Sequence, residues 1–320
     1  MELQTKIDIV RPNFEINYRS SILMIGSCFT ENIGEKLAYF KFNIDLNPCG
    51  IVYNPFSVAN VLQLLLAHKR LTGSDLLPNN GKWVSLLHHG RFSALQAADC
   101  LKNINERLEL SAARLKTTNV LIITWGTSWV YRYKENGMIV SNCHKFPAAA
   151  FDRFRLTVAE IVEKYTELIA RLKTLTPDLQ ILFTVSPVRH WKDGAHGNQL
   201  SKSVLLLAID ELVRKFDCVS YFPAYEIVMD ELRDYRFYAE DMLHPSTRTI
   251  DYIWEKFGEN YLSKETETLR KRIDKINKTL LHRSSDPDSP AALELQERLK
   301  KEIKEIEQEY GFTYLSTPGV

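Results

Sequence analysis

The sequence predicts an α/β fold in which helices cover both faces of a parallel sheet, and three observations support this prediction. Apolar runs of strand length alternate with amphipathic segments of helix length along most of the chain. The clearest run, Val120–Trp125, is almost entirely apolar, as expected of a strand that is buried on both faces. Glycine and polar residues follow several runs, and ligands bind at the carboxyl ends of the strands in such folds.

Five short runs are expected to form the sheet. They span residues 22–25, 43–46, 120–125, 180–185 and 218–221. They are rich in aliphatic residues, and turn residues follow several of them, which is typical of buried strands. Residues 83–93 are expected to form either an edge strand pair or a lid-like insertion. Within residues 129–140, the Asn-Gly pair at 136–137 favours the tight turn of a β-hairpin.

Amphipathic segments between these runs are expected to form helices. They span residues 31–40, 58–68, 101–115, 156–175, 200–216, 224–233 and 247–262. In the first segment, Ile33, Leu37 and Phe40 recur at the spacing of one helical face. The alternation of these helices with the strands therefore predicts crossover connections, which parallel strands require.

The composition changes after residue 262, where two charged segments carry narrow apolar stripes. The stripes comprise Leu269, Ile273, Ile276 and Leu280, and then Leu299, Ile303, Ile306 and Tyr310. Their spacing and the breaker-rich residues 284–290 between them predict an antiparallel helical hairpin. We therefore divide the chain into an α/β domain, residues 1–262, and a helical hairpin, residues 263–320. The hairpin is expected to pack on the α/β domain, with homodimer formation as the alternative.

The charge and composition exclude some functional classes. The chain has 320 residues, of which 45% are hydrophobic and 25% charged, as in ordinary globular proteins. Its net charge of +1, with Lys and Arg spread along the chain, argues against nucleic-acid binding, which needs a basic surplus. The sequence has no dinucleotide-binding glycine motif and no P-loop after any predicted strand.

Cysteine usage and the N-terminal sequence give expectations about cofactors and location. The five cysteines have neither disulfide-framework nor zinc-site spacing, so we expect no structural metal and no cofactor. The N-terminal segment lacks the apolar core of a signal peptide. No run approaches the roughly 20 apolar residues that a membrane span requires. A cytoplasmic protein without a membrane span is therefore expected.

Candidate nucleophiles lie in Ser21–Thr30, a stretch that is expected to pass from the first strand into the first helix. Ser27 and Cys28 follow Gly26 at this turn. The start of a helix offers free N–H groups and a partial positive charge. These properties favour a nucleophile there, and a tight turn with a small buried cysteine is the alternative interpretation.

Asp241 and His244 form an Asp-x-x-His motif near the end of the α/β domain. Acyl transfer by a side-chain nucleophile needs a base within hydrogen-bond reach and a third group that orients the base. This motif supplies both from one segment. The spacing alone is common, and its combination with a candidate nucleophile favours catalysis.

The motif Gly26-Ser27-Cys28-Phe29-Thr30 resembles the signature of the GSCFA family, with Thr in place of the final Ala. The segments NPCGIVYNP, TWGTSWVY, SPVRHWKDGAHGNQLSK and DMLHPS are also similar to that family. The resemblance covers about residues 20–262. This family in turn resembles the SGNH (GDSL-type) hydrolases, which implies a flavodoxin-like sheet and acyl-ester chemistry.

The resemblance implies roles for individual residues. Asp241 and His244 match the last SGNH block, while Gly50 and Ser128 occupy the positions of the oxyanion-binding glycine and asparagine. Serine in place of asparagine is a departure that weakens the case for catalysis. An ungapped match of the first block puts Cys28 on the nucleophile, and a shift by one puts Ser27 there. Cys28 is favoured because the ungapped match also aligns Thr30, and a helix start and an imidazolium, which lower a thiol's pKa, suit a cysteine nucleophile.

The family-like loops also supply predicted substrate contacts. These are Asn54, Thr127, His190 and Asn198. The resemblance implies an acyl-ester hydrolase or O-acyltransferase that forms an acyl-enzyme on an ester substrate, such as an acylated carbohydrate. The alternative hypothesis is a catalytically silent SGNH-like module that binds a glycan or a protein.

Overall fold

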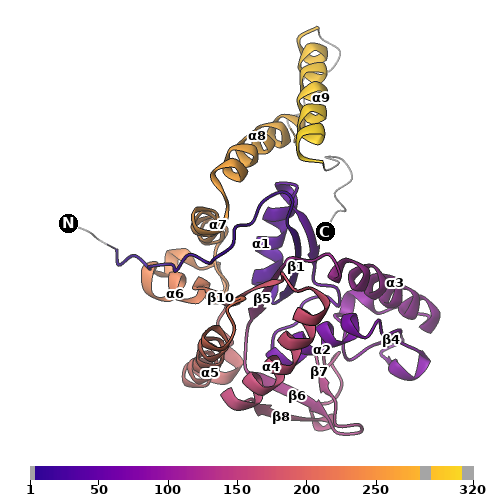
Figure 1. Ribbon diagram of the computed structural model, residues 1–320. Helices are drawn as coiled ribbons and strands as arrows, with labels where there is room; N and C mark the ends of the chain where they lie inside the picture. The colour runs from indigo at the N-terminus through magenta and orange to yellow at the C-terminus, as the bar shows by residue number, and fades with distance from the viewer. Residues whose placement is uncertain (1–3, 282–289, 312–320) are drawn as a thin grey trace.

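A five-stranded parallel sheet forms the centre of the computed structural model, which describes residues 4–281 and 290–311 (Figure 1). The strands lie in the order β10-β9-β5-β1-β2. Their bounds are β1 Ser21–Gly26, β2 Asn43–Leu46, β5 Val120–Trp125, β9 Gln180–Val185 and β10 Val219–Phe222. Counted along the chain, this is the 2-1-3-4-5 order of flavodoxin-like folds. The predicted fold class and all five predicted sheet strands are confirmed.

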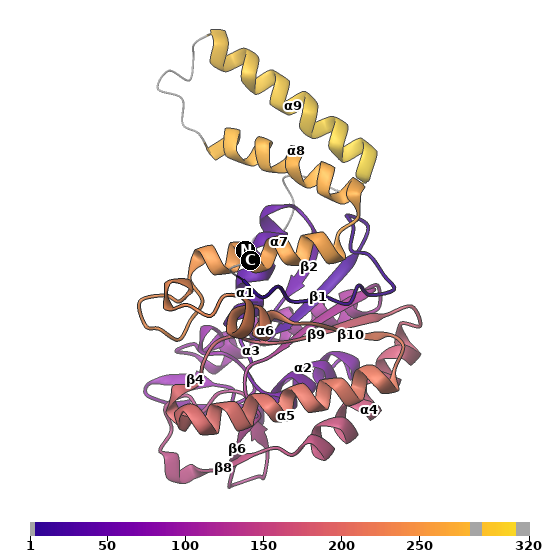
Figure 2. The ribbon, with the colours of Figure 1, turned by 90° about the vertical axis from the view of Figure 1, so that its left-hand side faces the viewer.

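Helices cover both faces of the sheet (Figure 2). One face carries α2 Pro55–Leu66, α3 Ala97–Leu115, α4 Val158–Leu175 and α5 Gly194–Lys215. The other face carries α1 Cys28–Tyr39, α6 Ala224–Glu226 and α7 Thr247–Tyr261. A π-helical turn, Ile227–Glu231, extends α6. None of the described helices is long and apolar enough to span a membrane.

Alternate side chains of β1 enter opposite cores, which explains the apolar composition of this strand. Leu23 and Ile25 belong to the core beneath α2–α5. Ile22 and Met24 belong to the core beneath α1 and α7. Successive side chains of a strand point to opposite faces, so a sheet covered on both sides needs apolar residues at every position.

Two small antiparallel sheets lie outside the central one. β3 Leu77–Asn79 pairs with β4 Lys82–Val84. In the second sheet, β6 Trp129–Tyr133 pairs with β7 Ile139–Val140, which agrees with the predicted hairpin. β6 also pairs with β8 Phe151–Arg155, a strand that the sequence did not indicate. Three of the five β8 residues are charged, so its pattern resembled a loop.

Four helices, α1, α2, α3 and α5, begin three to six residues earlier than predicted, and the differences at α1 and α5 affect the candidate site. α1 begins at Cys28 rather than near residue 31. α5 begins at Gly194 rather than at residue 200, so part of the expected loop is helical. The first turns of α5 bury Asn198, Ser201 and Lys202, and the buried face is therefore polar where an amphipathic pattern requires apolar residues.

The C-terminal segment forms α8 Lys264–Leu281 and α9 Pro290–Tyr310, which lie side by side (Figure 2). Arg272 of α8 forms ion pairs with Glu302 and Glu309 of α9, at 3.7 and 3.6 Å. The predicted breaker residues 284–289 lie outside the described residues. The antiparallel arrangement of the two helices agrees with the predicted hairpin.

The hairpin packs on the α/β part of the chain. Leu269, Ile273 and Ile276 of α8 and Ile306 of α9 are buried in the same core as α1 and α7. The Asn277 amide also donates to the backbone oxygen of Tyr39 at 2.6 Å. Most of the predicted α8 stripe is thus covered within one chain, and homodimer formation stays a prediction.

The substitution Ile273→Ala tests the energetic importance of this packing. Ile273 is fully buried, so removing its side chain leaves a cavity and should lower the free energy of unfolding by about 2–5 kcal/mol. The matched control is Leu280→Ala in the same helix, where the side chain is 52% exposed. That change should alter stability by less than about 0.5 kcal/mol. Urea denaturation measures both, and equal effects would contradict packing on the core.

Candidate active site

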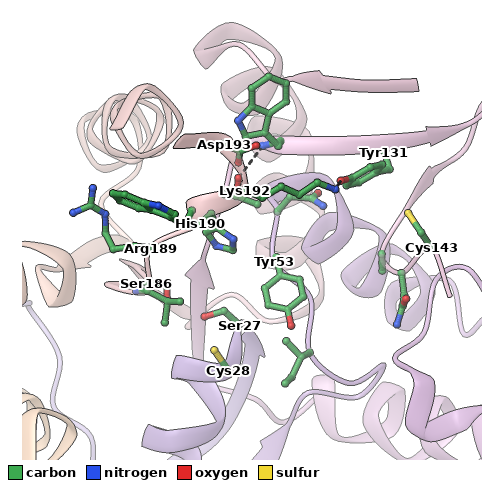
Figure 3. A pocket seen from close by; sticks show the side chains of 18 of the residues that line it. Ser27, Cys28, Tyr53, Tyr131, Cys143, Ser186, Arg189, His190, Lys192 and Asp193 are labelled. Carbon is green, nitrogen blue, oxygen red and sulfur yellow. Dashed lines mark hydrogen bonds between the residues drawn. The ribbon is translucent and has the colours of Figure 1, made fainter. Parts of the chain in front are cut away.

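A cavity of about 650 Å³ lies at the carboxyl ends of β1, β5 and β9 (Figure 3). Its lining includes residues that directly follow these strands. They are Ser27 and Cys28 after β1, Thr127 after β5, and Ser186 after β9. The parallel arrangement brings these segments together because all the strands end at the same edge of the sheet.

The strand-to-helix turn presents Cys28 to this cavity. Cys28 is the first residue of α1 and is half-buried. The pKa of its thiol is raised above the ordinary value, chiefly by burial and also by the charge of Glu31, while the N–H groups of Phe29 and Cys28 and the charge of Lys202 lower it only in part. The helix start therefore opposes the effect of burial, as expected for free N–H groups near a thiolate.

Ser27 is the N-cap of α1 and lies deeper than Cys28. It also lines the cavity, but only 1% of its surface is exposed. Its hydroxyl has no hydrogen-bond partner among the described residues. Both candidate nucleophiles thus line the cavity (Figure 3). Cys28 is the more exposed of the two.

Close packing at Gly26 fixes the course of this turn. A β-carbon on Gly26 would lie 2.4 Å from the carbonyl oxygen of Thr124 and 2.5 Å from the hydroxyl of Thr30. No side chain fits at such distances. The Gly26 N–H donates to the Asn47 side chain at 2.9 Å. The start of α1 is therefore held against β5 and against the segment that follows β2.

Asp241 and His244 form the expected pair at the edge of the cavity. His244 Nδ1 lies 2.6 Å from Asp241 Oδ2. Asp241 Oδ1 accepts the N–H groups of Leu243 and His244, both at 2.9 Å, and these bonds lower its pKa to about 2. The carboxylate is therefore charged at neutral pH and can orient the imidazole. His244 lines the cavity, while Asp241 lies behind it.

A second imidazole, His190, lies close to the turn. His190 and Ser27 both lie against Gly126. If Gly126 carried a β-carbon, that atom would lie 3.2 Å from His190 Nε2 and 3.7 Å from the Ser27 β-carbon. The backbone N–H of His190 donates to the side-chain oxygen of Asn198 at 2.9 Å. Burial and the charge of Lys202 lower the His190 pKa to about 4. His190 is therefore neutral at neutral pH, and Figure 3 shows it beside Ser27.

Lys202 lies behind the candidate site, and the sequence did not indicate any role for it. It is fully buried, and its Nζ donates to the carbonyl oxygens of Gly126 at 2.6 Å and Ser186 at 2.5 Å. No carboxylate among the described residues pairs with it. Burial and the charge of Arg189 lower its pKa to about 7, while Cys28 raises it. A lysine within a polar helical segment gave no signal of this burial.

The two predicted oxyanion donors do not face the cavity. The Gly50 N–H donates to the Asn47 carbonyl oxygen at 2.8 Å within a turn. The Ser128 hydroxyl is fully buried and donates to Ser201 at 3.1 Å. Neither residue lines the cavity. The assignment of these two residues to an oxyanion hole is therefore not supported by the geometry, because local hydrogen bonds already use their donors.

The four predicted substrate contacts occupy different positions. Thr127 and His190 line the cavity. Asn54 also lines it, but its amide caps α2 through Ser57, at 2.8 and 2.9 Å. Asn198 is buried behind His190, and its amide nitrogen has no partner among the described residues. Its contact with His190 indicates a positioning role.

The wall of the cavity is rich in aromatic and cationic side chains. Trp129 and Tyr131 lie beneath the Arg153 guanidinium, at 4.2 and 5.5 Å from the ring centroids. Arg153 forms an ion pair with Asp193, and Lys192 Nζ donates to the Tyr131 hydroxyl at 3.1 Å. Among the described residues, no group of three or more His, Cys, Asp or Glu side chains could hold a metal ion.

Several solved structures are similar to this chain at low sequence identity. A carbohydrate esterase family 3 protein from Talaromyces cellulolyticus is 8% identical and has a TM-score of 0.36, with 79% of this chain and 99% of that chain covered. An acetyl xylan esterase from Butyrivibrio proteoclasticus is 13% identical with a TM-score of 0.38, covering 83% and 65%. A Streptococcus pneumonia protein described as a platelet activating factor is 14% identical with a TM-score of 0.39, covering 80% and 86%.

A family model matches most of this chain. No curated protein sequence matches the chain significantly. The GSCFA family model matches residues 21–257, from the first strand of the sheet to the end of the α/β part. This match spans both the Ser27-Cys28 turn and the Asp241–His244 pair, and the chain belongs to the GSCFA family.

Proposed function

We propose that this protein is an acyl-ester hydrolase or O-acyltransferase that forms an acyl-enzyme on Cys28. One observation carries the proposal. A half-exposed thiol at the start of α1 and an imidazole held by a carboxylate line the same cavity. A nucleophile, a base and an orienting group are the elements that acyl transfer requires.

The mechanism follows from this arrangement. His244 accepts the thiol proton, and Asp241 holds the resulting imidazolium. The Cys28 sulfur forms a bond to the ester carbonyl carbon, and the carbonyl electron pair moves to oxygen. When the tetrahedral intermediate collapses, the C–O bond to the alcohol breaks and His244 returns the proton to the leaving oxygen. Water or an acceptor hydroxyl then attacks the thioester by the reverse sequence.

The start of α1 replaces the predicted oxyanion donors. The Cys28 and Phe29 N–H groups lower the pKa of the Cys28 thiol, which places them close to the sulfur, and a carbonyl oxygen bound next to the sulfur could accept from them. Donors that are fixed in place before the reaction stabilise the transition state without reorganisation. The ammonium group of Lys202 adds a positive charge near the thiol. Two backbone carbonyl oxygens bind this group.

Ser27 is the alternative nucleophile. Its hydroxyl has no partner among the described residues, and its β-carbon lies beside His190 across Gly126. In that mechanism, His190 is the base. Its low pKa keeps it neutral and able to accept a proton at neutral pH. The greater exposure of Cys28 favours the thiol.

A different observation favours a second function, a catalytically silent module that binds a glycan or a protein. Both residues at the positions of oxyanion donors, Gly50 and Ser128, donate to other protein atoms. Trp129, Tyr131 and Trp191 would provide apolar platforms for sugar rings in the cavity. This function requires no acyl-enzyme, so a test for the covalent adduct separates the two hypotheses.

Mass spectrometry of the intact protein after incubation with p-nitrophenyl acetate tests the acyl-enzyme. We expect a single acetyl adduct in wild type that is absent in Cys28→Ala. His244→Ala should form it about 10²–10⁴-fold more slowly, because the general base is lost. Asp241→Asn should also slow it while leaving the thermal unfolding temperature nearly unchanged.

The matched control is Ser27→Ala, which removes only the neighbouring nucleophile. If the adduct disappears in Ser27→Ala and persists in Cys28→Ala, the nucleophile is Ser27. If all the variants acquire the same adduct as wild type, the label is not at the proposed site, and the binding-module hypothesis replaces the enzyme hypothesis.

Alkylation of Cys28 by iodoacetamide as a function of pH tests the influence of Lys202. The charge of Lys202 lowers the Cys28 pKa, and with a Lys202 pKa of about 7 this charge is lost as pH rises above 7. Lys202→Met should therefore raise the Cys28 pKa and slow alkylation most near pH 7 and progressively less toward pH 8. Peptide mapping distinguishes Cys28 from Cys143, which also lines the cavity. Lys192→Met, on the same cavity wall, is the matched control and should leave the Cys28 profile unchanged. Identical profiles in both variants would contradict the influence of Lys202.

A further inference from the structure

A second cavity, of about 640 Å³, adjoins the candidate active site. Arg189 and Trp191 line both cavities, so they form the wall between them. Asp241 and Leu243 also line the second cavity, beside the catalytic His244. The Arg189 N–H donates to the Leu243 carbonyl oxygen at 3.3 Å, which ties this wall to the Asp-x-x-His turn. A ligand in the second cavity would therefore lie next to the catalytic pair.

Arg189 forms no ion pair with an acidic side chain among the described residues. Its Nη1 lies 3.7 Å from the Met229 sulfur, and its guanidinium is 5.8 Å from the centroid of the Trp191 ring. Its Nε is buried without a hydrogen-bond partner among the described residues. Figure 3 shows Arg189 extending away from Ser27 and Cys28. An always-charged group with an unused buried donor indicates a missing acceptor.

Arg233 contributes a second cation to the same cavity. It is exposed and forms no ion pair with any described residue. Its φ of +25° lies in the left-handed region, which is uncommon for a residue with a long side chain. Backbone strain of this kind is typical of functional loops.

The carboxylates of the second cavity do not neutralise these arginines. Asp234 accepts the Arg236 N–H at 2.8 Å and forms an ion pair with Arg236 at 3.7 Å. Asp241 is occupied by His244 and by two N–H groups. Both carboxylates thus have their own partners, and the two arginines are left as the unmatched charges.

The remaining wall suits a sugar ring. Trp191 and Tyr235 are 55% and 75% exposed, and Tyr238 lines the same cavity. Exposed aromatic rings beside arginines can stack on the apolar face of a sugar while the guanidinium groups bind an anion. Arginine is well suited to carboxylate and phosphate because it donates two parallel hydrogen bonds.

We propose that the second cavity binds a carboxylate or phosphate group carried on a carbohydrate substrate, with Arg189 as the main contact and Arg233 as the second. This proposal rests on the proposed function in one respect, namely that the substrate is an ester. It adds that the substrate is an acylated anionic sugar, whose acid group binds here while its ester reaches Cys28.

Titration of the intact protein with three non-ester sugars, followed by ligand-observed NMR, tests this proposal without requiring catalysis. The probes are glucuronate, glucose 6-phosphate and glucose. We expect binding of at least one anionic sugar, weakened roughly tenfold or more in Arg189→Gln by loss of a charged hydrogen bond. Arg233→Gln should weaken binding by a smaller factor, and added salt should weaken it further. Glucose should bind more weakly than either anion.

The matched control is Arg214→Gln, an exposed arginine on α5 that lines neither cavity. It should bind the anionic sugars as wild type does. The relative affinity of the carboxylated and phosphorylated probes identifies the anion. Equal binding of glucose, unchanged binding in both Arg189→Gln and Arg233→Gln, or no binding of either anionic sugar would overturn the proposal. The acetyl adduct on Cys28 is measured separately, so failure of one proposal is distinguishable from failure of the other.

Discussion

The close contact between β1 and β5 at Gly26 is the constraint on which the candidate site depends. A β-carbon at this position would lie 2.4 Å from the Thr124 carbonyl oxygen, so only glycine allows the chain to turn there. Because the turn is this tight, α1 begins at Cys28, and its first N–H groups lie beside the thiol. The sheet therefore positions the candidate nucleophile and its electrostatic environment together.

Lys202 connects the ends of the other two strands that border the cavity. Its Nζ binds the carbonyl oxygens that follow β5 and β9, so one ammonium group joins two segments that are far apart in the sequence. Burying a lysine without a carboxylate costs free energy, and the lowered pKa expresses that cost. A buried ammonium group stabilises negative charge that develops nearby. Cys28 is the neighbouring group that would carry such a charge.

The Asp-x-x-His turn lies between two cavities with different properties. On one side, His244 faces the thiol-bearing cavity, and on the other, Asp241 faces the cavity with the unmatched arginines. The backbone bond from Arg189 to Leu243 couples the two. Substrate binding and proton transfer would thus act on the same short segment. The helical hairpin lies apart from this site and extends the core beneath α1 and α7.

The sequence by itself determined the five strands of the central sheet, most helices and the Asp241–His244 pair. Hydrophobic periodicity reports burial within one element, and an Asp-x-x-His turn closes through local hydrogen bonds. Tertiary structure alone decided what each polar group contacts. The sequence placed Gly50 and Ser128 by alignment, but their donors are used by Asn47 and Ser201. It also gave no sign of the buried Lys202, because a polar side chain becomes buried only when separate strand ends supply acceptors for it.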